Sequence, residues 1–120
     1  MQEQLKDRTK QFAVDIFEFC EELPNRPQCW VIENQLLRSA SSVGANYRAA
    51  CRAQSRNAFI AKMAIVEEEA DESLFWLEMI EELMHAPPDG LNPLQQEAAE
   101  LLAIMAKSKA SARKNQSSGD

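Results

Sequence analysis

The sequence predicts an all-α domain, an antiparallel four-helix bundle whose helices run up, down, up and down. The first observation is that only three of the 120 residues are glycine and five are proline, and the prolines fall in two short stretches, 24–27 and 87–93. The second is that apolar side chains outside those stretches recur every three or four residues, the period of a helix buried on one face. Short connections between long helices make successive helices antiparallel.

The first two helices are predicted over residues 3–23 and 28–53. The first ends before Pro24, because the residue before a proline avoids helical geometry. The second contains many small residues between positions 39 and 53, and these would let a neighbouring helix approach closely. Gly44 costs about 1 kcal/mol in helix propensity relative to alanine, which indicates a packing role.

The third and fourth helices are predicted from start signals and apolar spacing. Residues 56–85 contain no glycine or proline and follow Ser55, a good N-cap. For the fourth helix, Asn92 is the expected cap and Pro93 the first helical residue. We expect the bundle to span residues 1–114, with a flexible polar tail at 115–120. One shared core is expected for these residues: Ile16, Phe19, Leu36, Val43, Phe59, Met63, Val66 and Leu101.

Apolar residues surround the second half of the third helix. After Leu74 they point in every direction around the helix axis, whereas a bundle covers one side of each helix. Their remaining surface would form an exposed apolar patch, and such patches mark interaction sites. We therefore expect contacts with another copy of the chain, and the candidate interface residues are Phe75, Trp76, Met79, Ile80 and Leu83.

Charge is unevenly distributed along this acidic chain, which carries a net charge of −6. Acids cluster at residues 67–72, and like charges four residues apart repel each other. Arg38, from the same or a neighbouring subunit, is expected to form an ion pair with Glu69 or Glu72. The alternatives are a solvated acidic face and a metal site. A basic segment, Arg48, Arg52, Arg56 and Lys62, provides low-ranked candidates for nucleic-acid binding, although the overall charge argues weakly against it.

Catalytic patterns are lacking in this sequence. Its one histidine, His85, cannot complete a zinc set or a nucleophile–base pair alone, and Cys20, Cys29 and Cys51 are expected to be reduced apolar fillers. We predict no enzyme, no cofactor, no metal and no small-molecule ligand. Without a signal-like start or an apolar run of membrane length, the expected location is the cytoplasm, with no membrane contact.

A family resemblance rests on residues 35–48, Gln-Leu-Leu-Arg-Ser-Ala-Ser-Ser-Val-Gly-Ala-Asn-Tyr-Arg, followed by Arg52, Ser55 and Phe59, and on residues 69–78. These segments resemble the bacterial four-helix-bundle family named for proteins encoded in intervening sequences of 23S rRNA genes. The resemblance implies an up-down bundle and ring-like assembly, with five subunits in similar proteins. A related branch, the accessory proteins of diversity-generating retroelements, works with a reverse transcriptase and nucleic acid; that branch is typically basic.

The leading hypothesis is a non-catalytic interaction module that forms a ring-like homo-oligomer. Its partner is another copy of the same chain. The alternative is an RNA- or DNA-binding accessory protein that uses the basic segment of the second and third helices.

Overall fold

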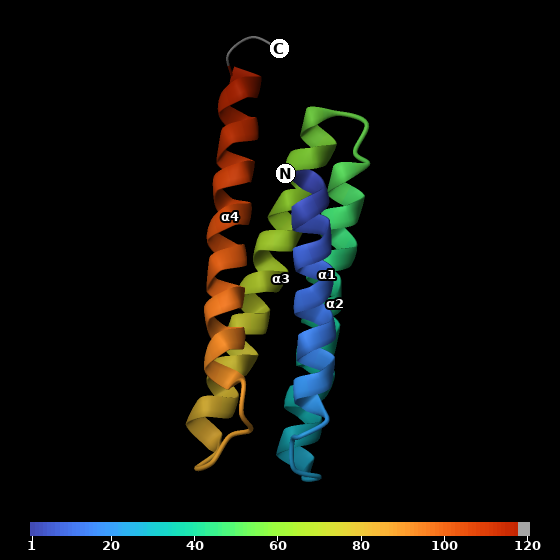
Figure 1. Cartoon of the computed structure of the whole chain (residues 1–120). Helices are drawn as coiled ribbons and strands as arrows, with labels where there is room; N and C mark the ends of the chain where they lie inside the picture. Colours follow the sequence, from blue (N-terminus) through green and yellow to red (C-terminus); the bar gives the residue numbers. More distant parts are fainter. Residues whose placement is uncertain (118–120) are drawn as a thin grey trace.

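The computed structural model describes the backbone of residues 1–117 and the side chains of residues 1–115. Its helices are α1 (Gln2–Cys20), α2 (Pro27–Cys51), α3 (Arg56–Leu83) and α4 (Leu91–Ser117). They alternate in direction along a rod of 53 × 22 × 21 Å (Figure 1), so the predicted antiparallel bundle is confirmed. Because α1 and α3 each pack against α2 and α4, they lie diagonally across the bundle.

Helix ends differ from the sequence expectation by a few residues. Ser55 caps α3 as predicted, since its Oγ accepts a hydrogen bond of 3.1 Å from the amide of Ala58. Helix α1 stops at Cys20, and the next three amides donate to carbonyls three residues back, a tighter 3₁₀-type turn before Pro24. Helix α3 stops at Leu83, two residues before the expected end at His85.

The start of α4 was predicted wrongly. Gly90, with φ of 97°, ends the loop in a conformation that favours glycine, and its carbonyl accepts the amide of Leu94 at 3.2 Å. Asn92 and Pro93 are therefore inside the first turn of α4, and Asn92 is not the cap. Of the tail expected at 115–120, residues 115–117 continue α4, and residues 118–120 are outside the described part.

The core runs along the bundle axis and contains most of the predicted residues. Ile16, Leu36, Val43, Met63, Val66 and Leu101 are fully buried, and Phe19 is nearly so. Phe59 is only partly buried at the edge of the core. On α3 the buried residues do not keep to one straight line along the helix, so Ile60, Ser73 and Ile80 face inward, whereas Phe59, expected in the core, lies at its edge.

Small and polar residues bring the helices close together. A Cβ atom built on Gly44 would lie 3.4 Å from the backbone oxygen of Thr9, so this glycine permits the close approach of a neighbouring helix that the sequence predicted, and that helix is α1. Ser73 Oγ donates to Ser39 Oγ at 2.9 Å inside the α2–α3 contact. Thr9 is fully buried and donates to the carbonyl of Leu5 at 2.8 Å. Buried hydroxyls thus have partners.

Candidate functional site

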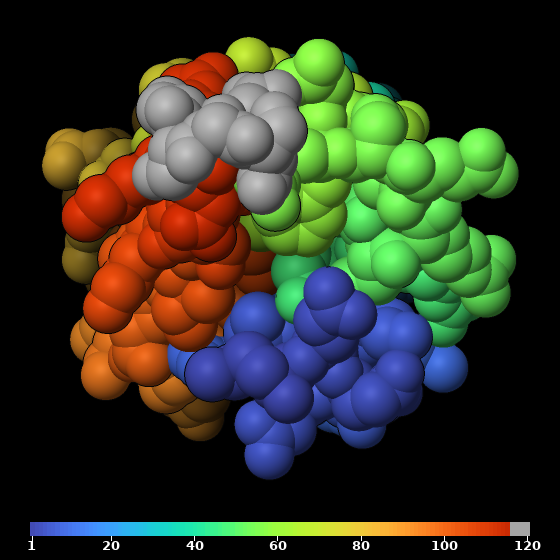
Figure 2. Space-filling model, turned by 90° about the horizontal axis from the view of Figure 1, so that it is seen from above, coloured from blue at the N-terminus to red at the C-terminus, as the bar shows by residue number. Residues whose placement is uncertain are grey.

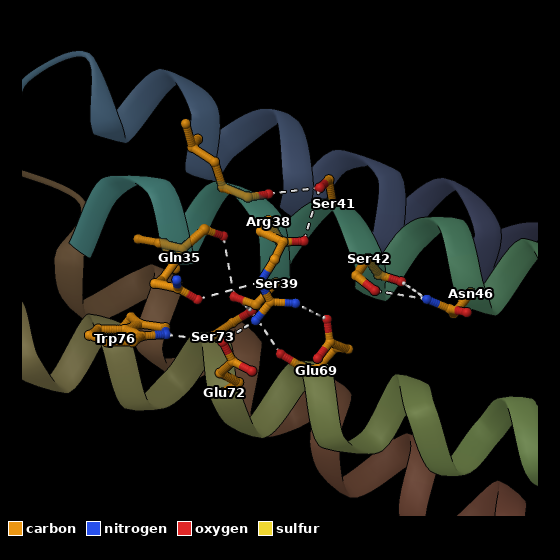
Figure 3. Close-up of polar contacts among 12 residues, drawn as sticks. Gln35, Arg38, Ser39, Ser41, Ser42, Asn46, Glu69, Glu72, Ser73 and Trp76 are labelled. Atoms are coloured by element: carbon orange, nitrogen blue, oxygen red, sulfur yellow. Dashed lines mark hydrogen bonds and ion pairs between the residues drawn. The ribbon is translucent and has the colours of Figure 1, made fainter. Parts of the chain in front are cut away.

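A polar network joins α2 to α3 on the outside of the bundle (Figure 3). Arg38 Nη1 lies 2.9 Å from Glu69 Oε2, and Nη2 contacts Glu72 Oε2. Glu72 also accepts a hydrogen bond of 3.2 Å from Trp76 Nε1. The structure therefore brings together all three residues that the sequence singled out for ion pairing, Arg38, Glu69 and Glu72, within one chain. The contact ties the middle of α2 to the middle of α3.

These contacts stabilise the charged forms of their partners. The hydrogen bond from Arg38 is the main cause that lowers the pKa of Glu72, while partial burial acts in the opposite direction. The same hydrogen bond raises the pKa of Arg38. Arg38 remains half-exposed, so the network sits at the rim of the α2–α3 contact. Its geometry suits a structural link rather than proton transfer.

Ion pairs of Arg8 and Lys109 were not anticipated from the sequence. Arg8 of α1 donates from Nε and Nη2 to both carboxylate oxygens of Glu97 in α4, at 2.8 and 2.7 Å, and also reaches Glu100. Lys109 Nζ lies 2.6 Å from Glu67 Oε1, joining α4 to α3. The acidic block at 67–72 is thus neutralised in part by cations from both flanking helices, α2 and α4.

Large apolar side chains are exposed on α3 and at the start of α2. Phe75 is 49% exposed, Leu83 53% and Val31 58%. Trp76 and Met79 are partly buried, and the rings of Phe75 and Trp76 meet edge to face at 4.9 Å. Ile80 must be removed from the predicted interface, because it points into the core and is 1% exposed. We use the name α3 apolar face for four residues of α3, Phe75, Trp76, Met79 and Leu83, together with Val31 of α2.

A second exposed apolar region lies near α1. Phe17 of α1 and Trp30 of α2 are each 48% exposed. Trp30 Nε1 donates to Asn25 Oδ1 at 2.7 Å, which holds the indole in place. Phe17 and Phe75 belong to diagonally opposed helices. Both apolar regions nevertheless include a residue from the start of α2, Trp30 in one and Val31 in the other.

The basic segment lies at the end of the bundle where α2 passes into α3. Arg48 and Arg52 are exposed, whereas Arg56 and Lys62 are partly buried. Of these four nucleic-acid candidates, only Arg48 and Arg52 are therefore readily accessible on the surface. Arg48 lies in the last turn of α2, and Arg52 is the residue directly after that helix.

Reactive side chains are poorly placed for chemistry. His85 is exposed beyond the end of α3. All three cysteines are free, and burial raises the pKa of the Cys20 thiol to about 12. Among the described residues, no cluster of three or more His, Cys, Asp or Glu is arranged to hold a metal ion. None of the helices described is both long and apolar enough to cross a membrane.

The fold and the α2–α3 network define a protein of the four-helix-bundle class. Residues 2–107 match the model of the 23S rRNA-intervening sequence protein family, and the chain belongs to that family. It is also similar to the crystal structure of a protein of unknown function from the S23 ribosomal protein family of Bacteroides thetaiotaomicron. The two share 32% identity over 92% of this chain and 99% of the other, with a TM-score of 0.81. No curated protein matches.

Proposed function

We propose that this protein is a non-catalytic interaction module that assembles with copies of itself. The exposed α3 apolar face is the observation that carries the proposal. Phe75, Leu83 and Val31 leave about half of their surfaces uncovered by the chain's own helices. Burial of apolar surface is the main favourable term in association, so these side chains favour a protein partner.

Exposed apolar side chains on opposite sides of the bundle support a ring over a two-fold dimer. An isologous dimer uses the same patch on both subunits, whereas a ring joins one patch to a different patch on the next subunit. Phe17 and Phe75 are exposed on diagonally opposed helices, so they can contact two different neighbouring subunits, as the second arrangement requires. Five subunits is the number that the family resemblance implies.

The proposal includes no catalysis, because neither the Cys20 thiol nor His85 is well placed for it. The Cys20 thiol is buried with a raised pKa, and thiolates rather than thiols react. His85 is exposed beyond the end of α3, and among the described residues no hydrogen bond joins it to a hydroxyl or thiol that it could deprotonate.

The interface can be tested with two variants of α3. Phe75→Ser combined with Leu83→Ser removes two exposed side chains of the α3 apolar face, and we expect the mass of the particle to fall with helical content unchanged. Ile65→Ser is the matched control, since Ile65 is another exposed apolar residue of α3 outside that face. A double variant that keeps the assembled mass contradicts this location of the interface.

A second candidate function, binding of nucleic acid, is favoured by one observation. Arg48 and Arg52 are exposed together at one end of an otherwise acidic molecule. Clustered cations attract phosphate groups in a salt-dependent manner. This candidate is compatible with a ring, which would repeat the basic end in every subunit.

A further inference from the structure

A shallow groove of about 220 Å³ lies between the first half of α1 and the second half of α2. Its floor is made of small residues, Ala13, Gly44 and Ala45, with Ser41 beside them. Gly44 draws the two helices together, since a Cβ at this position would already be within 3.4 Å of the α1 backbone. The close approach leaves a hollow between the longer side chains on either side.

Three cations and no acid line this groove. Lys6 and Lys10 extend from α1 and Arg48 from α2. Lys6 forms an ion pair with Glu3, with 2.6 Å between Nζ and Oε1. Lys10 and Arg48 have no ion-pair partner in the part of the chain that the structure describes. Carboxylates, by contrast, line the two grooves between α1 and α4 that lie nearest the α3–α4 loop, and Asp15 belongs to both.

We infer that this α1–α2 groove binds phosphate groups of a nucleic-acid backbone. The inference rests on the second candidate function and gives it a site. Uncompensated cations side by side repel each other, and an anion between them removes that repulsion. Arginine and lysine are the side chains that bind phosphate best. Pockets for drug-sized ligands are about 300–1,000 Å³, so this smaller open groove suits a phosphate group better.

A chain of phosphates fits better than a single anion. Lys6 and Lys10 are one turn apart on α1, and the exposed Arg52 follows directly after the end of α2, four residues beyond Arg48. These rows continue the positive charge toward the end of the bundle shown in Figure 2, at which α1 begins and α2 ends. The groove contains no aromatic side chain on which a base could stack. Binding should therefore be independent of sequence and confined to the backbone.

The test is fluorescence anisotropy with a labelled oligothymidylate at about 50 mM salt, where phosphate contacts are strong. We expect binding that weakens as salt rises, with a slope of about −0.7 per phosphate contacted. Lys10→Gln combined with Arg48→Gln should weaken it about tenfold or more, because two phosphate contacts are lost. The matched control is Arg26→Gln with Lys107→Gln, which removes the same charge from surfaces outside the groove.

The control should bind within about twofold of the native chain, as its groove is intact. Equal losses in the two double variants would overturn the site, since attraction would then depend on net charge alone. Absence of binding by the native chain at low salt would overturn it too. Competition by inorganic phosphate at the same phosphate concentration as the oligonucleotide would contradict a chain ligand. The mass of the particle is measured separately, so failure here leaves the self-association proposal standing.

Discussion

Arg38 of α2 and Glu69 of α3 form an ion pair, 2.9 Å from Nη1 to Oε2, at the rim of the contact between their helices. The guanidinium is half-exposed, and exposed pairs contribute only about 0.2–1 kcal/mol. A double-mutant cycle with Arg38→Met and Glu69→Gln should give a coupling free energy in that range. Chemical denaturation of the four proteins measures it.

A second cycle serves as the control. Glu78 is exposed on α3 and forms no hydrogen bond or ion pair with Arg38 among the described residues. Coupling between Arg38→Met and Glu78→Gln should be close to zero. If the two cycles gave equal values, the specific contact between Arg38 and Glu69 would not be what stabilises the fold.

Acid should weaken the same network through Glu72. Because Arg38 lowers the pKa of Glu72 in the folded state, its contribution is fully present above the ordinary value of 4.5 and is lost as pH falls through the lowered folded pKa. Native protein should be more stable than Glu72→Gln at neutral pH, and the difference should shrink below that ordinary value. Unfolding curves recorded at several pH values test this. A difference that grew toward low pH would contradict the assigned direction.

The sequence predicted α2 better than α3, and the reason is physical. A repeat of three and four residues kept Leu36 and Val43 of α2 on one face from end to end. On α3 apolar residues are so abundant that periodicity alone could not separate Ile80, which is buried, from Phe75, which is exposed. Ser73 is buried because Ser39 provides its partner, and a pairing between helices is not visible along one sequence.

The ion pairs also show that contacts between helices distant in the sequence are hard to predict from the sequence alone. Arg38 could be linked to the acidic block because α2 and α3 are joined by a short turn, which fixes their relative register. Arg8 and Glu97 are at opposite ends of the chain, and their helices meet only after the whole bundle closes. The α1–α2 groove likewise depends on how closely Gly44 lets α1 approach, which composition does not reveal.

Core truncation should separate the true core from its edge. Leu36 is fully buried, so Leu36→Ala should lower the free energy of unfolding by about 2–5 kcal/mol. Phe59 is only partly buried, and Phe59→Ala should cost less than the roughly 3–5 kcal/mol typical of a fully buried phenylalanine. Urea denaturation measures both. A larger cost at Phe59 than at Leu36 would place the core differently.

Substitutions of Gly44 should reveal how tightly α1 and α2 pack. Alanine gains helix propensity but meets the Thr9 carbonyl oxygen at 3.4 Å, so Gly44→Ala should change stability little. Gly44→Leu should destabilise the fold by about 1–3 kcal/mol, because its side chain would have to push α1 away. Thermal unfolding tests the pair. Equal stability of the leucine variant and the native protein would show that the contact is loose.

The central claim is self-association, and the mass of the native particle in solution tests it most directly. Size-exclusion chromatography with multi-angle light scattering at micromolar concentration gives this mass without any variant. The account predicts a particle several times heavier than the 13.5 kDa chain, and a five-subunit ring would have five times that mass. A single species at 13.5 kDa would contradict the account, because the α3 apolar face would then remain exposed in a stable monomer.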